Sequence, residues 1–139
     1  AGSLIADRFV DTNVFLRFLT GDDPAKFERC RRLFEQALSG AVTLHTSELV
    51  VAELVWTLLS YYELPKPQVI EKVGQILNTP YLTVPNQDIL TEALVLWSRH
   101  TCDFIDAYNA ALMRGQALTD VMSYATAFDL FPSLRRQEP

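Results

Sequence analysis

The chain has 139 residues, the length of one ordinary domain, and its 49% of hydrophobic and 21% of charged residues exclude a disordered or low-complexity protein. Its 12 basic and 17 acidic residues leave a net charge of −5, which disfavours an anionic partner such as nucleic acid unless a bound cation neutralises several acids. No apolar run approaches the roughly 20 residues of a membrane-spanning helix, and the N-terminus lacks the order of a signal peptide, so we expect no membrane association and a cytoplasmic location.

Short β-rich runs alternate with longer helical patterns along the chain. Hydrophobic spacing, caps and Gly or Pro breaks predict, in chain order, a strand at 4–10, helices at 14–19 and 24–38, a strand at 42–45, helices at 46–61 and 68–77, a strand at 81–84, helices at 88–98 and 104–114, and a strand at 117–124. Strands separated by helices require crossover connections. The pattern therefore predicts an α/β fold, a three-layer sandwich with a mainly parallel central sheet.

We expect a single domain over residues 1–139, because no repeat or flexible linker interrupts the pattern. Residues 1–3, Ala-Gly-Ser, are a candidate cloning scar, and residues 135–139 are predicted to form a loose tail. The two cysteines, Cys30 and Cys102, lie far apart in sequence, with no histidine at metal-ligand spacing. A zinc site or a disulfide scaffold is therefore not expected.

Asp11 follows the first predicted strand directly. In open α/β sheets ligands bind outside the carboxyl ends of the strands, so an acid at this position is a candidate site residue. The alternative is a purely structural role, in which Asp11 caps the next helix and Thr12 and Asn13 form the turn. Both interpretations stay open from this residue alone.

Glu53 lies in an otherwise apolar run, residues 49–56, with no obvious water-facing stripe. Burying an unpaired carboxylate is costly, so Glu53 must find a cation, lose its charge or reach a cleft. No basic residue stands three or four positions away, which excludes an ion pair within the helix. Either Glu53 pairs with a distant arginine or it belongs to a site.

Asp103 and Asp106 are three residues apart at the start of a predicted helix, so they share one face of it. An acid at the cap and another at the third position can serve the helix dipole without any ligand. We nevertheless assign Asp106 to the site, because the alanines that follow it let the helix pack closely. For Asp103 both interpretations stay open.

Together these acids favour the chemistry of a hard divalent cation. Mg²⁺ takes oxygen ligands and is commonly held by carboxylates together with substrate phosphates. Such an ion helps to form hydroxide from water and stabilises charge on a leaving oxygen, so we expect phosphodiester hydrolysis. The two histidines, His45 and His100, have no placed nucleophile, and we expect structural or solvent-facing roles for them. No motif of a P-loop, a dinucleotide-binding fold or a hydrolase elbow occurs.

Residues 9–24, Phe-Val-Asp-Thr-Asn-Val-Phe-Leu-Arg-Phe-Leu-Thr-Gly-Asp-Asp-Pro, resemble the opening of PIN-domain proteins of the VapC toxin type. Glu53 after Val51-Ala52, and the segment 103–107, Asp-Phe-Ile-Asp-Ala, match the later acidic motifs of this family in order and spacing. The resemblance covers nearly the whole chain.

The resemblance implies a PIN-like fold and an endoribonuclease that depends on Mg²⁺ or Mn²⁺. It also implies an RNA substrate, a homodimer, and a cognate antitoxin with a segment that enters the active-site groove. Asp11, Glu53 and Asp106 would be the catalytic, metal-binding acids and Asp103 an accessory ligand. Thr12 and Asn13 would support Asp11.

One departure from the family concerns its usual fourth acid, in a pattern of Ser or Thr, an aromatic residue and Asp. Here Ser123-Tyr124 leads into Ala125, so Ser123 keeps its supporting place while the carboxylate is missing. Asp129 would substitute only if the loop folds back, and Asp120 is a less plausible substitute. Ala125 is either a natural loss or an inactivating replacement, and we expect the missing acid to weaken binding of a second cation more than it disturbs the fold.

The main prediction is a metal-dependent ribonuclease toxin, impaired to some degree by Ala125. The alternative is a catalytically silent PIN-like module that binds RNA or protein. A phosphorylated receiver-like domain is disfavoured, because none of the three lysines follows a late strand.

The apolar residues around 49–62 are more than one small core can bury, which predicts a surface for a second copy or an antitoxin helix. Candidate nucleic-acid contacts are Arg17, Arg29, Arg31, Arg32, Arg99 and Arg114.

Overall fold

The computed structural model describes residues 5–139. Leu4 and the candidate scar at 1–3 lie outside the described residues. The chain divides into two compact units, Ala1–Pro85 and Asn86–Pro139, and each is described by itself. A single domain over residues 1–139 stays a prediction.

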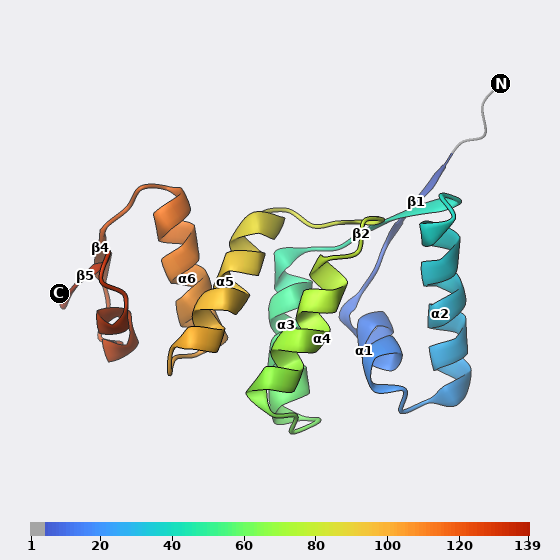
Figure 1. The fold of residues 1–139 in the computed structure, drawn as a ribbon, viewed down its shortest axis with the longest axis horizontal. Helices are drawn as coiled ribbons and strands as arrows, with labels where there is room; N and C mark the ends of the chain where they lie inside the picture. Colours follow the sequence, from blue (N-terminus) through green and yellow to red (C-terminus); the bar gives the residue numbers. More distant parts are fainter. Residues whose placement is uncertain (1–4) are drawn as a thin grey trace. The chain divides into compact units, whose positions relative to one another are not determined.

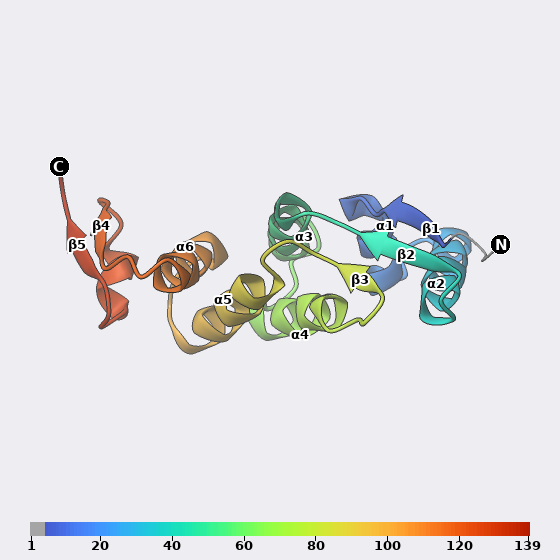
Figure 2. The ribbon, with the colours of Figure 1, turned by 90° about the horizontal axis from the view of Figure 1, so that it is seen from above.

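The first unit is a parallel sheet with helices packed around it (Figure 1). Strand β2 lies between β1 and β3, and both pairings are parallel, with Ala6 opposite Val42 and Leu44 opposite Leu82 (Figure 2). In chain order the elements are β1 Ala6–Phe9, α1 Thr12–Thr20, α2 Pro24–Leu38, β2 Val42–His45, α3 Glu48–Ser60, α4 Lys66–Leu77 and β3 Leu82–Thr83.

Local sequence signals explain where these helices begin and end. The side chain of Asp23 accepts a hydrogen bond from the Lys26 amide (3.0 Å) and Pro24 opens α2, while Ser47 caps α3 through the Val50 amide (3.1 Å). Gly21 ends α1 in the left-handed region, at φ 63°, where a side chain would be strained.

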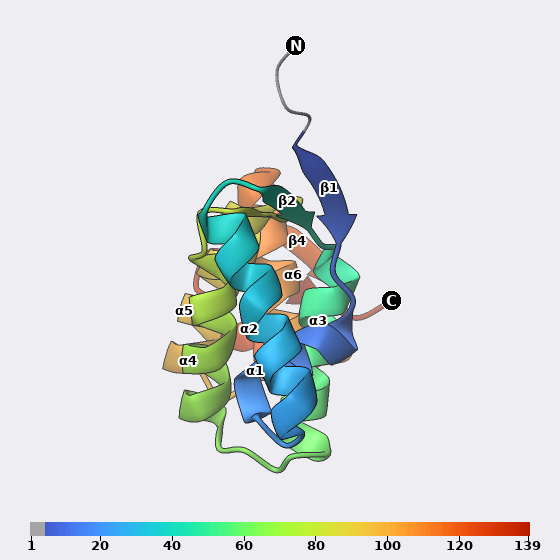
Figure 3. The same cartoon turned by 90° about the vertical axis from the view of Figure 1, so that its right-hand side faces the viewer.

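The core of the first unit is aliphatic under the sheet and aromatic between α1 and α2. These two helices pack against each other (Figure 3), and the ring of Phe34 lies 4.6 Å from Phe18 and 6.1 Å from Phe15. On the other helices Leu54, Leu58, Val69 and Val73 are wholly buried, as is Leu44 on β2. This packing fixes α1 and α3 on the sheet and so positions Asp11, at the start of α1, and Glu53, in the middle of α3.

The second unit is a helix pair followed by a small parallel ribbon. Helices α5 and α6 pack together, with the rings of Trp97 and Phe104 in edge contact at 5.7 Å. Phe128, Phe131 and Leu134 form a buried cluster with Ala110 of α6. The elements are α5 Gln87–Arg99, α6 Phe104–Gly115, β4 Asp120–Met122, the 3₁₀ helix η1 Thr126–Leu130 and β5 Arg135–Gln137.

The predicted α/β class, with parallel strands flanked by helices, is confirmed. The predicted bounds of α2 and β2 match the structure, whereas the strand expected at 117–124 is only 120–122. Ala117 cannot belong to the strand, because its φ of 56° lies far from the extended region. No helix within residues 5–139 combines the length and the apolar character needed to cross a bilayer.

Residues 135–137 form β5, where the sequence predicted a loose tail. The amide of Arg135 donates to the Thr119 carbonyl (2.7 Å), the amide of Ser123 donates to the Gln137 carbonyl (2.9 Å), and β5 pairs with β4 in parallel. A polar, terminal sequence gives no hydrophobic signal for such a strand, because backbone hydrogen bonds and ion pairs hold it.

Candidate active site

Asp11 lies at the carboxyl end of β1, where it serves as the N-cap of α1 and is exposed. Its Oδ1 accepts a hydrogen bond from the Thr12 amide (2.8 Å). Its other oxygen accepts no hydrogen bond from the described residues. The capping interpretation is therefore correct, and it leaves half of the carboxylate available to a ligand.

The start of α3 lies beside the same end of the sheet. Thr46, between β2 and α3, donates from Oγ1 to the Val10 carbonyl (2.8 Å), and the Val10 amide donates to the His45 carbonyl (2.8 Å). Helix α1 also packs against α3. The first unit thus brings the capping residue of α1 close to the first turns of α3.

Glu53 is exposed on α3, contrary to the expectation that this helix has no water-facing stripe. The exposed face of α3 was not predicted from the sequence because Leu49 and Trp56, which lie on it, are apolar. Leu49 is 81% exposed and Trp56 is 67% exposed. The competing prediction, an ion pair with a distant arginine, is not found within residues 5–139. The carboxylate of Glu53 is therefore accessible to a cation from solution.

Asp103 and Asp106 belong to the second unit, at the start of α6. Asp103 is the N-cap by backbone geometry, yet its side chain makes no capping hydrogen bond, so the purely structural interpretation lacks its main contact. Asp103 is exposed and Asp106 half-buried, and neither carboxylate has an ion-pair partner in the part of the chain that the structure describes.

The four acids are divided between the units, Asp11 and Glu53 in one and Asp103 and Asp106 in the other. Among the described residues no three His, Cys, Asp or Glu side chains form a group that could hold a metal. That the acids converge on one ion stays a prediction. The donor types do fit a hard divalent cation, since all are carboxylate oxygens without a competing basic partner.

Thr12, predicted to support Asp11, is 4% exposed, and its hydroxyl is the one buried side-chain polar atom without a hydrogen-bond partner in residues 5–139. Leaving a buried hydroxyl unsatisfied costs about 1–3 kcal/mol. Asn13, the second predicted support, is exposed on the same turn. A buried hydroxyl without a hydrogen-bond partner next to Asp11 is typical of a ligand-binding site, where an unfavourable group is retained for function.

We expect Thr12→Val to raise the free energy of unfolding by about 1 kcal/mol, because it removes the unsatisfied hydroxyl and keeps the shape. Thr46→Val is the matched control, since Thr46 is equally buried at 4% but donates to the Val10 carbonyl. The control should lose about 1–2 kcal/mol. Urea unfolding measures both, and equal losses in the two variants would contradict this assignment.

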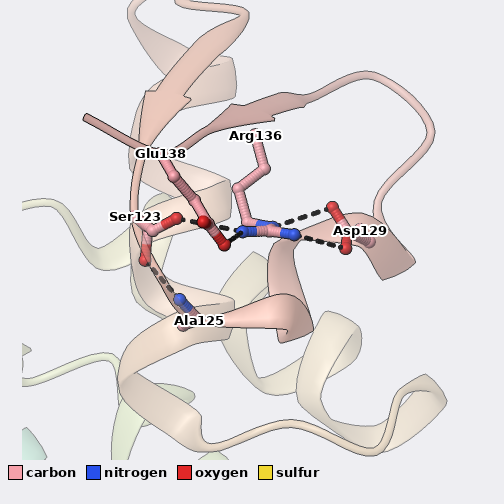
Figure 4. A network of polar contacts seen from close by, with 5 residues as sticks. All are labelled: Ser123, Ala125, Asp129, Arg136 and Glu138. Atoms are coloured by element: carbon pink, nitrogen blue, oxygen red, sulfur yellow. Dashed lines mark hydrogen bonds and ion pairs between the residues drawn. The ribbon is translucent and has the colours of Figure 1, made fainter.

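The fourth-acid position lies in a polar network around Arg136 (Figure 4). The amide of Ala125 donates to Ser123 Oγ (2.9 Å). Arg136 binds both oxygens of Asp129 (3.0 and 3.2 Å), Glu138 (2.8 Å) and the Ser123 carbonyl (3.2 Å). These contacts tie the end of the chain to the turn at Ser123 and Ala125.

Both candidate substitutes for the missing carboxylate form ion pairs, and a role for either as the fourth acid stays a prediction. Asp129 is held by Arg136, and Asp120 pairs with Arg135 at 2.9 Å. The sequence did not predict the contacts of Arg136. The only sequence signal for it is the Arg-Arg-x-Glu stretch at 135–138 after the Phe-Asp pair, and a pattern of local charges does not reveal which carboxylates an arginine binds.

We expect Arg136→Lys to lower the Tm by roughly 4 °C, because a lysine cannot reproduce the forked contact to Asp129 together with the bonds to Glu138 and Ser123. Arg135→Lys is the control, since Arg135 is 74% exposed and makes one ion pair. It should lower the Tm by less than about 1 °C. Differential scanning calorimetry compares the two, and equal Tm values would show that the network adds no stability.

Both histidines make contacts within the protein, which agrees with the predicted structural or solvent-facing roles. His45 Nε2 lies 2.8 Å from Asp7 on the neighbouring strand. His100 bonds the Leu96 carbonyl through Nδ1 (2.9 Å) and packs on the Phe131 ring.

The chain is similar in sequence to known ribonucleases. The chain is 28% identical to a VapC ribonuclease of Aquifex aeolicus, over 87% of this chain and 89% of the relative, and 26% identical to ribonuclease VapC13 of Mycobacterium tuberculosis, over 91% and 96%. The crystal structure of VapC20 from M. tuberculosis, described as a toxin that cleaves the sarcin-ricin loop, aligns over 90% of this chain and 95% of its own at 20% identity and a TM-score of 0.43. The profile of the PIN domain matches residues 8–130, so the chain belongs to the PIN domain family.

Proposed function

We propose that this protein is an endoribonuclease of the VapC toxin type that hydrolyses RNA phosphodiester bonds with Mg²⁺ or Mn²⁺. The observation that carries the proposal is the family match over residues 8–130, which contains all four candidate acids and the Ala125 position. The two relatives named as ribonucleases align over nearly their whole length, which supports the same activity here.

In this proposal Asp11, Glu53 and Asp106 hold the cation, with Asp103 as an accessory ligand. When bound, the ion activates water and stabilises negative charge on the phosphate. The Thr12 amide fixes the orientation of the Asp11 carboxylate through its hydrogen bond to Oδ1. Thr12 and Asn13 add a hydroxyl and an amide beside Asp11, and Ser123 keeps the backbone of the fourth position in place through the Ala125 amide.

Two partners and a location belong to the same proposal: a second copy of the chain, a cognate antitoxin, and the cytoplasm. The exposed side chains of Leu49, Trp56 and Tyr61 at α3 provide apolar surface of the kind that protein partners cover.

A second candidate function, a silent PIN-like module that binds RNA or protein, is favoured by the resemblance to the family, which implies an acid at the position of Ala125. The test is RNA cleavage with Mn²⁺ and with EDTA, measured for this chain and for Ala125→Asp. Cleavage by either form, abolished by EDTA, supports the nuclease. RNA binding by both forms without cleavage supports the module.

A further inference from the structure

A cavity of about 280 Å³ opens between α1 and α2, next to the Asp11 end of the sheet. Asn13, Val14 and Arg17 of α1 and Lys26, Arg29 and Cys30 of α2 line it. Three of these six side chains are cationic and one is an amide. We call this cavity the basic groove.

The charges of the basic groove are largely uncompensated. Among residues 5–139 the side chains of Lys26 and Arg29 have no acidic partner. Only Arg17 is ion-paired, with Asp22 at 2.7 Å. Burial raises the pKa of the Cys30 thiol, so the thiol stays neutral and adds no negative charge.

Most other arginines considered for nucleic-acid contacts are engaged elsewhere. Arg31 binds Glu28 and Glu35, Arg32 lies 3.6 Å from Glu28, and Arg114 binds Glu92. A side chain already held by a carboxylate must give up that partner before it binds a phosphate. Lys26 and Arg29 need no such exchange, and an arginine can bind phosphate through two parallel hydrogen bonds.

The groove begins beside the candidate active site, because Asn13 is only two residues from Asp11 and lies on the first turn of the same helix. The Asn13 amide and the cations of Lys26 and Arg29, which form no ion pair among residues 5–139, are donors that suit the oxygens of a nucleic-acid backbone. Val14 and Cys30 form the uncharged part of the groove wall.

Resting on the proposed function, we propose that the basic groove binds backbone phosphates of the RNA substrate beside the bond that is cut. Lys26 and Arg29 contact the phosphates, and Asn13 joins the groove to Asp11. Such contacts fix the register of the strand and are independent of its sequence. They also let a protein of net charge −5 hold a polyanion, because the basic groove is a local exception.

The test is equilibrium binding of a fluorescent single-stranded RNA in EDTA, where metal-dependent cleavage does not occur. We expect Arg29→Gln and Lys26→Gln each to weaken binding about fivefold at every RNA sequence tested. Each should also reduce the slope of log K against log salt by about 0.7, the loss of one phosphate contact on a single strand. Arg135→Gln is the control and should change neither, because Arg135 is an exposed arginine of β5 with one ion pair and does not line the groove.

Three results would overturn the inference: no measurable RNA binding, unchanged affinity in both groove variants, or an equal loss in Arg135→Gln. Binding of poly-glutamate is measured in parallel to distinguish an acidic protein ligand from RNA. If the groove binds an acidic protein instead, Lys26→Gln and Arg29→Gln weaken poly-glutamate binding and leave RNA binding unchanged. The cleavage assay stays separate. If the groove variants bind RNA more weakly but no form cleaves RNA, the groove is supported and the nuclease is contradicted. If the chain cleaves RNA but the groove variants bind it unchanged, the nuclease is supported and the groove is contradicted.

Discussion

Ala125→Asp is expected to raise Mn²⁺-dependent RNA cleavage by about 100-fold, the effect typical of one well-placed charged group at a phosphoryl or acyl site. The backbone at Ala125 is extended, with φ −77° and ψ 112°, so aspartate fits without strain. Its amide is already held by Ser123 Oγ, which fixes where the new side chain starts. Initial rates on single-stranded RNA, with Mn²⁺ in excess, measure the change.

Ala125→Asn is the matched control, because it has the shape of aspartate without the charge, and it should leave the rate at the level of the present chain. RNA affinity in EDTA is followed in parallel. An aspartate variant that binds RNA and cleaves no faster than the asparagine variant would favour the silent binding module.

Asp11→Asn, made in the Ala125→Asp form, is expected to reduce cleavage by about 1000-fold. Asparagine caps a helix as well as aspartate does, so α1 and the fold should persist. It carries no charge, however, and is a poorer ligand for a hard cation. We therefore expect slower RNA cleavage with a Tm that is unchanged to within about 2 °C.

Asp88→Asn is the control for this experiment, since Asp88 is an exposed acid in the first turn of another helix, α5, and lies outside the family motifs. It should leave the rate unaltered. If Asp11→Asn cleaves as fast as the control, Asp11 is only a cap. A large fall in Tm would instead mean that the rate reflects unfolding.

Elements with strong local signals could be predicted from the sequence. The Asp23-Pro24 pair fixed the start of α2, because a side-chain cap followed by proline suits only the first helical turn. The residues of β5 gave no such signal. Their strand depends on hydrogen bonds to residues 119 and 123 and on the ion pairs of Arg135 and Arg136, which are tertiary contacts.

For the candidate site the sequence predicts a set of residues, and both their roles and their arrangement around one ion stay predictions. Asp11 was placed correctly because a strand end and a helix start meet there. The exposure of Glu53 was missed, since its neighbours Leu49 and Trp56 are apolar yet exposed, and hydrophobic periodicity reports the buried face only when the outer face is polar.

The central claim, that Asp11, Glu53 and Asp106 grip one ion, is tested most directly by a crystal structure of the protein soaked with Mn²⁺. The ion is located by its anomalous scattering. We predict one Mn²⁺ with carboxylate oxygens of all three residues among its ligands. An ion held elsewhere, or Glu53 paired with an arginine and the three carboxylates on separate surfaces, would contradict the claim.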